Sequence, residues 1–160
     1  MSASNGYTRI QIGLHWIMAL LIAGAFFTHE SMGDALRQKI ESGVSGVGSP
    51  TPHTILGMLA LIFVLWRIVV RIRNGAPEAH GSPAVAMAAM WGHRVLYLLM
   101  IAVPIGGFTA WVGGYRDVGD LHGLAGKALI IIALGHALMA FWHQWVKRDG
   151  TITRMVKPGE

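Results

Sequence analysis

The stretch of sequence that decides the fold is residues 121–146, LHGLAGKALIIIALGHALMAFWHQWV. It is apolar over the length of a membrane span and lacks the strict alternation of a strand, so it predicts one long helix. Within it, His122 and His136 are fourteen residues apart. At roughly 100° and 1.5 Å per residue, fourteen residues return to nearly the same face of a helix about 21 Å further along. This helix therefore presents one imidazole near each side of a membrane, both pointing the same way.

Three further runs of similar length and composition precede it in the chain. The 160 residues are 53% hydrophobic and 13% charged, with a mean hydropathy of +0.49, far from an average soluble chain. Each run is long enough to cross a hydrocarbon core of about 30 Å, and in lipid a helix satisfies its own backbone. We therefore predict an all-α membrane protein, a four-helix transmembrane bundle that forms a single domain over residues 1–160. The spans are expected at residues 10–28, 52–72, 87–112 and 121–146.

Lysine and arginine are distributed unevenly between the two sides of this arrangement. With the N-terminus inside, the outer segments hold only Arg37, Lys39 and Arg116, and Lys127 lies within the fourth run. The remaining basic residues fall on the inner side, which predicts that both termini are cytoplasmic. The pI of about 10.1 then reflects topology and anionic lipid rather than nucleic-acid binding. The inner basic residues are Arg9, Arg67, Arg71, Arg73, Arg94, Lys147, Arg148, Arg154 and Lys157.

The connection between the first two runs has two parts. We expect a short surface helix over residues 34–41 and a flexible, Gly/Ser-rich connector over residues 42–50. Thr51-Pro52 is typical of an N-cap followed by proline at the first helical position, which places His53 in the first turn of the second span. His80 falls in the short inner loop, where we expect it to be exposed.

The histidines fall into two sets according to their expected depth in the membrane. The chain has no cysteine, which excludes thiolate-held iron–sulfur clusters and disulfides. A six-coordinate haem takes two facing imidazoles at one depth, so the two sets suit two haems stacked across the bilayer. The inner set is His15, His93, His136 and His143, and the outer set is His29, His53 and His122.

Not every histidine needs a functional role. An isolated histidine at a membrane interface is usually a polar anchor, and we interpret His29 and His80 in this way. For His143 both interpretations stay open, because the neighbouring Trp142 and Trp145 are typical of an aromatic belt. The four residues interpreted as ligands form two depth-matched pairs, and they are His15, His53, His122 and His136.

Glycines lie close to these four histidines. They leave room for a flat macrocycle between helices, although they serve helix–helix packing equally well. These glycines are Gly13, Gly57, Gly123, Gly126 and Gly135.

Spacing alone leaves one ligand undecided. His15 and His29 are also fourteen residues apart, so the first span is able to pair both its histidines with those of the fourth span. His29 would then take the place of His53. Against this alternative, His29 stands next to Glu30 at the ragged end of its span.

Several motifs of this chain resemble the bacterial cytochrome b561 family, and its superoxide oxidase members most closely. The motifs are Gln11-Ile-Gly-Leu-His15-Trp16, Trp91-Gly-His93-Arg94, and His122 followed by His136 and His143. The similarity extends from about Tyr7 to Met155. It implies a four-helix bundle with two b-type haems that exchanges electrons with the ubiquinone pool.

The resemblance also implies roles for individual residues. The inner haem would be held by His15 and His136, and the outer haem by His53 and His122. Matching the family's positions, His93 and His143 would lie near the inner haem and the quinone pocket, with Trp16 beside them. The basic residues that end the second span are able to pair with haem propionates or lipid phosphates, and they are Arg67, Arg71 and Arg73.

The function implied by the resemblance is that of a superoxide:ubiquinone oxidoreductase in the bacterial inner membrane. Superoxide would be oxidised at the periplasmic face and ubiquinone reduced near the cytoplasmic face, with His143 or His93 relaying protons. One observation opposes superoxide as the donor, because an anion is captured fastest by a positive surface. The outer segments hold five acidic residues, Glu30, Asp34, Glu41, Asp117 and Asp120, against three basic ones.

Two alternatives remain beside this function. An electron-relay subunit would pass electrons from a periplasmic dehydrogenase or hydrogenase to quinone, although the short outer loops offer little surface for docking such a partner. A haem-free protein with a histidine-lined metal path is less consistent with the sequence, because transport would call for carboxylates within the spans and there are none.

Overall fold

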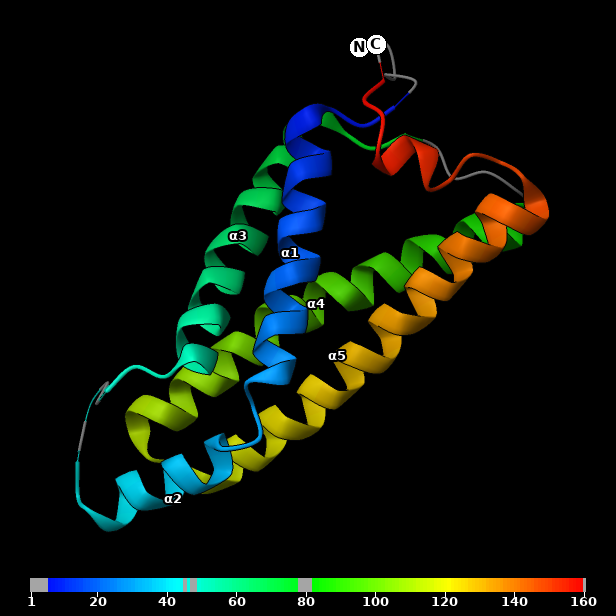
Figure 1. Cartoon of the computed structure of the whole chain (residues 1–160). Helices are drawn as coiled ribbons and strands as arrows, with labels where there is room; N and C mark the ends of the chain where they lie inside the picture. Colours follow the sequence, from blue (N-terminus) through cyan, green and yellow to red (C-terminus); the bar gives the residue numbers. More distant parts are fainter. Residues whose placement is uncertain (1–5, 45, 47–48, 78–81, 160) are drawn as a thin grey trace.

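The computed structural model describes residues 6–44, 46, 49–77 and 82–159, and these segments consist of helices joined by turns and short irregular connections (Figure 1). Four of its helices, the last taken together with the turn η1, are long and apolar enough to span a membrane. The prediction of an all-α chain with four spans is therefore confirmed. The elements are α1 (Arg9–Phe27), α2 (Met32–Glu41), α3 (Pro52–Asn74), α4 (Pro83–Gly113), α5 (Arg116–Trp142), the π-helical turn η1 (His143–Lys147) and the 3₁₀ turn η2 (Thr153–Met155).

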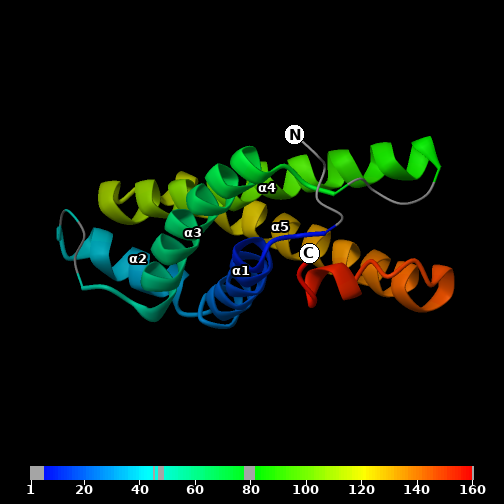
Figure 2. The ribbon, with the colours of Figure 1, turned by 90° about the horizontal axis from the view of Figure 1, so that it is seen from above.

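The four long helices form two antiparallel pairs. In Figure 1, α1 runs beside α3 and α4 runs beside α5, and the second pair crosses behind the first. Helix α3 also packs on α4, whereas α1 and α5 touch at few positions (Figure 2). Both termini lie at one end of the molecule, which we call the termini end, and Gly159 N donates to Tyr7 O at 3.1 Å. The opposite end, where α2 lies, is the α2 end.

The buried core belongs mainly to α1, α3 and α4. Met18, Ala60 and Val64 are buried together, and Val64 is fully enclosed. Leu56 of α3 approaches so closely that a Cβ on Gly24 of α1 would lie 3.2 Å from it. Helix α5 contributes only Leu129 to the buried residues, and most of its other large apolar side chains face outward, as suits contact with lipid.

The helix ends follow the local signals of the sequence. Thr51 caps α3, with its Oγ1 accepting from Thr54 N at 3.2 Å and Pro52 in the first turn, so His53 stands where the sequence placed it. Helix α2 begins at Met32, two residues before the expected start. Helix α5 begins five residues before the apolar run, because polar residues at an interface continue a helix as readily as apolar ones. His80 lies outside the described residues.

One buried side chain ties two helices together at the termini end. Gln11 is 8% exposed, and its Oε1 accepts from Thr8 N at 2.9 Å. Its Nε2 donates to Gly75 O at 2.8 Å. Gly75 ends α3 with a φ of +71°, a left-handed value that favours glycine. A single amide therefore caps α1 and fastens it to the end of α3.

We expect Gln11→Leu to lower the free energy of unfolding by about 1–3 kcal/mol, because it removes both hydrogen bonds that this buried side chain makes, with Thr8 N and Gly75 O. Thermal or denaturant unfolding of the detergent-solubilised protein measures the loss. Gln38→Leu on the exposed face of α2 is the matched control and should change stability by much less. Equal effects of the two substitutions would contradict the assigned role of Gln11.

Candidate functional site

Two imidazoles face each other near the α2 end. His53 of α3 and His122 of α5 have ring centroids 5.8 Å apart, with their planes at 83°. His53 Nδ1 donates to Ala25 O at 2.8 Å, and His122 Nδ1 donates to Val103 O at 2.8 Å. Because a carbonyl only accepts, each ring keeps its proton on Nδ1 and leaves Nε2 unprotonated. This is the tautomer in which histidine binds a metal through Nε2.

Three imidazoles gather nearer the termini end, one each from α1, α4 and α5. The ring centroids of His15 and His136 are 6.3 Å apart, and those of His93 and His136 are 5.1 Å apart. His93 Nδ1 donates to Ala89 O at 2.7 Å, which turns its other nitrogen away from its own helix. The structure thus brings together the two pairs that the sequence analysis interprets as ligands, His15 with His136 and His53 with His122.

The ring separations match two ligands on opposite sides of one iron. Imidazole nitrogen binds metals at about 2 Å, which places two opposed ring centres about 6 Å apart. The His15–His136 and His53–His122 separations lie close to this value, and the His93–His136 separation is shorter. Within the described residues no group of three or more His, Cys, Asp or Glu side chains is arranged to hold a bare ion. Paired imidazoles suit a macrocycle, which supplies the four other ligands itself.

The glycines near these histidines border open space. A Cβ added at Gly57 or Gly126, one turn along from His53 and His122, would meet no neighbouring atom within 4 Å. The same holds for Gly13, Gly123 and Gly135. Packing against protein atoms does not require these glycines, each of which costs a helix about 1 kcal/mol relative to alanine. Gly57 and Gly126, four residues beyond His53 and His122, leave open surface on the same helix faces as these imidazoles, as a flat haem would require.

Gly107 has a different role, because it lets α4 approach the ring of His122. A Cβ on Gly107 would lie 2.8 Å from His122 Cε1 and 3.0 Å from Nδ1. A Cβ on the preceding Gly106 would lie 3.8 Å from His122 Cβ, an ordinary contact. Only the second glycine of the pair is therefore required by the position of the imidazole.

His29 does not face His122. It lies beyond the end of α1, stacks on Phe26 with ring centroids 5.1 Å apart at 19°, and bonds through Nδ1 to Phe26 O. The geometry therefore pairs His53 with His122, and it leaves His29 against its own helix end.

Basic and aromatic side chains surround the inner imidazoles, as the sequence suggests for Arg67, Arg71 and Trp16. Arg67 Nη2 donates to His15 Nδ1 at 3.1 Å, and Arg67 Nε donates to the Tyr97 hydroxyl at 2.9 Å. The Arg71 guanidinium lies 5.8 Å from the Tyr97 ring centre. Trp16 meets the His15 ring edge-on at 5.4 Å and donates its Nε1 proton to Met155 O at 2.8 Å. Arg73 is exposed at the end of α3.

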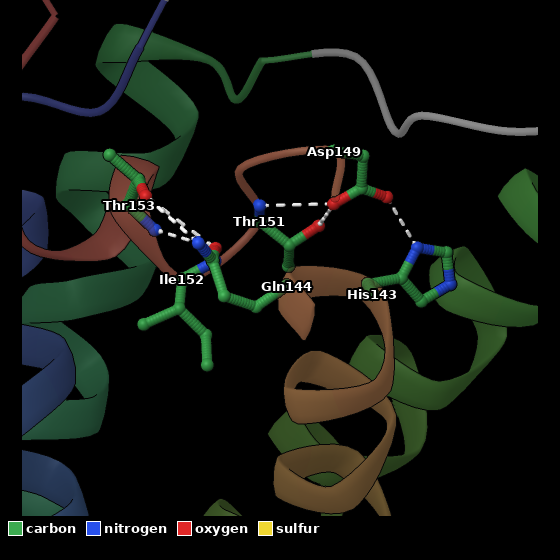
Figure 3. A network of polar contacts seen from close by, with 6 residues as sticks. All are labelled: His143, Gln144, Asp149, Thr151, Ile152 and Thr153. Atoms are coloured by element: carbon green, nitrogen blue, oxygen red, sulfur yellow. Dashed lines mark hydrogen bonds and ion pairs between the residues drawn. The ribbon is translucent and has the colours of Figure 1, made fainter. Parts of the chain in front are cut away.

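His143 stands apart from this cluster, at the start of η1. Seven residues beyond His136, it lies on nearly the same face of the helix about 10 Å further along. Its Nδ1 lies 2.5 Å from Asp149 Oδ2 (Figure 3). Burial opposes ionisation of Asp149, but hydrogen bonds from Thr151 and His143 outweigh it and lower the pKa of the carboxyl to about 2. Asp149 is therefore ionised at neutral pH.

Sequence reasoning missed three polar residues of this region: Asp149, Tyr97 and Gln11. For Asp149 a signal was present, since it is an acidic residue six positions after His143 in a tail that is mostly basic. Gln11 belongs to a quoted motif, but its bond to Gly75 and the bond of Tyr97 to Arg67 join different helices, so no local pattern indicates them.

Comparison with known proteins identifies the family. A family model described as prokaryotic cytochrome b561 matches residues 6–158. The chain belongs to this family. The resemblance carried by its motifs is thereby confirmed, and the protein is a prokaryotic membrane cytochrome that carries haem b and transfers electrons.

Relatives of this cytochrome include proteins of nearly the same length. Cytochrome b562 of Cereibacter sphaeroides is 40% identical over 161 residues, which cover 99% of each chain. The protein named "Probable superoxide oxidase CybB" of Yersinia pestis is 29% identical over 174 residues, covering 94% of this cytochrome and 95% of that protein. Cytochrome b561 homolog 2 of Escherichia coli is 27% identical over 181 residues, covering 94% and 90%.

We expect Gly107→Ala to lower the haem bound per polypeptide, because the added methyl displaces the His122 ring. A pyridine haemochrome assay of the purified cytochrome measures the loss. Gly106→Ala adds the same methyl one residue earlier and should bind haem as the wild type does. Full haem content in Gly107→Ala would show that His122 does not need its observed position.

Proposed function

We propose that this cytochrome carries two b-type haems and passes electrons from superoxide at the periplasmic face to ubiquinone near the cytoplasmic face. His15 and His136 hold the inner haem, and His53 and His122 the outer one. The observation that carries the proposal is the presence of two facing imidazole pairs, joined by one helix and separated by about 21 Å of helix rise.

The distribution of charge supports an orientation with both termini in the cytoplasm. The termini end holds the arginines that finish α3 and the basic residues of η1 and the tail, whereas the α2 end holds most of the acidic residues. Short loops rich in lysine and arginine stay inside during membrane insertion. We therefore assign the protein to the bacterial inner membrane, as one transmembrane domain with a periplasmic α2.

The residues of the chain orient the haems and balance their charge. A bound b-type haem supplies one-electron chemistry at its iron. The carbonyls of Ala25 and Val103 fix the outer rings and raise their basicity as ligands. At the inner pair, Arg67 donates to Nδ1 of His15. A guanidinium donates hydrogen bonds and accepts none, so Nδ1 carries no proton and the proton of His15 is on Nε2. Binding of iron through Nε2 of His15 would require Arg67 to release Nδ1, and Arg67 and Arg71 would then be the residues that balance the charge of the haem propionates.

The quinone site lies at the cytoplasmic side of the inner haem. Trp16, His93 and His143 supply aromatic and polar groups in a mostly apolar setting, which is the composition of a site for a quinone headgroup. Reduction of ubiquinone to ubiquinol consumes two electrons and two protons. An imidazole binds a proton on one ring nitrogen and releases one from the other, so His143 and His93 are suited to deliver the protons.

Superoxide as the donor is supported by the name of the Yersinia pestis relative and by basic residues at the α2 end. Those residues are not equivalent. Arg37 pairs with Asp34 on the surface of α2, which largely neutralises it. Lys39 is 7% exposed and lies over the Trp111 ring, 5.5 Å from its centre. Arg116 is exposed and starts α5, so it is the basic residue best placed to attract an anion from solution.

We expect the purified cytochrome to contain two low-spin haems per polypeptide, because each imidazole pair provides both axial ligands. Haem quantification and a redox-difference spectrum measure this. His53→Ala should lose one haem and His29→Ala none. A single haem in the wild type, a high-spin ferric spectrum, or the reverse result for the two variants would contradict the ligand assignment.

We expect superoxide to reduce the haems quickly at low ionic strength and more slowly as salt screens the basic residues. Changing Arg37, Lys39 and Arg116 together to glutamine should slow this reduction severalfold at low salt, with Arg116 contributing most. Pulse radiolysis followed by haem absorbance measures the rate. Lys157→Gln removes a charge at the opposite end and serves as the control.

A different outcome would favour the electron-relay function. The net acidic character of the α2 end suits a basic protein donor better than an anion. If superoxide leaves the haems oxidised while a periplasmic dehydrogenase or hydrogenase reduces them, the chain is a relay subunit. Its haem ligands and quinone site would be unchanged by that result.

A further inference from the structure

The C-terminal tail places a carboxylate directly against the imidazole of His143. His143 Nδ1 and Asp149 Oδ2 are 2.5 Å apart, and the two side chains are only 16% and 18% exposed (Figure 3). The other carboxylate oxygen, Oδ1, accepts from Thr151 N at 3.0 Å and from Thr151 Oγ1 at 2.6 Å. The carboxylate is therefore held from both sides, with one oxygen committed to the imidazole.

The choice of partner is informative, because basic side chains are plentiful at this end. Asp149 is the only acidic residue at the termini end among those that the structure describes. It follows Lys147 and Arg148 in the chain, and Arg154 and Lys157 come soon after. A carboxylate needed only to balance charge would pair with one of these. Here it is turned toward the imidazole instead.

The backbone of the tail is shaped to make this contact. Helix α5 ends in the π-helical turn η1, and Arg148 follows in the left-handed region with a φ of +54°. Gln144 holds the returning chain, with its Oε1 accepting from Ile152 N at 3.0 Å and Thr153 N at 3.3 Å (Figure 3). Left-handed backbone is unfavourable for an arginine, and π-turns are often found at functional sites. The turn brings Asp149 back to the residue that starts it.

We propose that Asp149 is a positioning residue that keeps the proton of His143 on Nδ1 and supports the imidazolium form, so that Nε2 delivers protons to bound quinone. This proposal rests on the proposed function, because it needs quinone reduction beside His143. A carboxylate bonded to Nδ1 sets the tautomer of an imidazole and stabilises its protonated form without itself taking the proton. Asp149 is suited to this role because its lowered pKa keeps it ionised.

The proton and electron balance of the step is complete with the partners already named. One ubiquinone takes up two electrons and two protons and leaves as ubiquinol. The two electrons come from two superoxide ions, which leave as two molecules of oxygen. Each proton passes from Nε2 of His143 to a quinone oxygen, and the imidazole regains a proton from cytoplasmic water. Asp149 keeps its charge throughout and exchanges no proton.

The test measures how fast ubiquinone oxidises the pre-reduced cytochrome, so that superoxide is not needed. Haem absorbance in a stopped-flow instrument reports the reaction with a water-soluble short-chain ubiquinone. We expect Asp149→Asn to slow it about 10- to 100-fold, because a positioned acid contributes about 10²–10⁴-fold. The solvent isotope effect should increase, since proton delivery then limits the rate. Asp149→Glu, which retains the charge, should restore most of the rate.

A second readout is independent of activity. Nitrogen-15 NMR of the histidine-labelled cytochrome should show the neutral His143 ring protonated on Nδ1 in the wild type. In Asp149→Asn the proton should move to Nε2, while the haem spectra stay unchanged. Thr153→Val is the control, because it removes a side-chain contact with Gln144 in the same tail and leaves the bonds that hold the backbone and the carboxylate in place, so it should retain the wild-type rate.

The possible failures are distinguishable. If ubiquinone does not oxidise the wild type, or if His143→Ala reacts at the wild-type rate, the proposed quinone site is wrong. If His143→Ala is slow and Asp149→Asn is normal, the role of Asp149 alone is refuted. If Thr153→Val is as slow as Asp149→Asn, or if the tautomer of His143 is the same with and without the carboxylate, Asp149 only fastens the tail and the proposal fails.

Discussion

The fixed rise and rotation of α5 set the position of everything else in this molecule. His122 and His136 point the same way at two depths because fourteen residues of α-helix allow no other arrangement. Each other long helix then brings one group to meet them. Helix α3 provides His53, α1 provides His15, and α4 provides His93 together with the space at Gly107. The imidazole pairs therefore connect the two helix pairs, because His15 of α1 and His53 of α3 each face a histidine of α5.

The outer imidazoles also show how packing and ligand chemistry depend on each other. Neither His53 nor His122 is oriented by its own helix. The carbonyl of Ala25 on α1 holds one ring, and the carbonyl of Val103 on α4 holds the other. All four long helices thus contribute to one pair of rings. If any of these helices shifted by one residue, an imidazole would lose the carbonyl that accepts its Nδ1 proton. The ring would then be free to turn, and its N–H would be left without a partner in an apolar interior, which is costly. The same shifts of the helices would therefore lower the stability of the fold and disturb the positions of the ligands.

The sequence was sufficient for the spans, the helix cap at Thr51 and the two imidazole depths, because each follows from local hydropathy or from spacing along one helix. It left His29 and His53 as alternatives for the partner of His122. The choice between them depends on how α3 faces α5, which is a contact between segments distant in the sequence. The same reason hides the contact of Arg67 with His15, 52 residues away. The contact of Asp149 with His143 was missed for another reason. It requires a π-helical turn and an arginine with left-handed backbone angles, and no periodicity in the sequence indicates either.

The two ends of the molecule differ in a way that matches the chemistry proposed for them. Oxidation of superoxide to oxygen releases an electron and no proton, so the outer site needs only ligands held in place, and both outer rings have their Nδ1 protons tied to backbone carbonyls. Reduction of a quinone consumes protons, and His93 and His143, which lie outside the ligand pairs, are at the termini end. At the α2 end, the imidazole outside the ligand pair is His29, which is bonded to Phe26 O and stacked on the Phe26 ring. The difference between the two ends favours a directional path for electrons. They would enter at the α2 end, where no proton is transferred, and leave at the termini end, where protons are consumed.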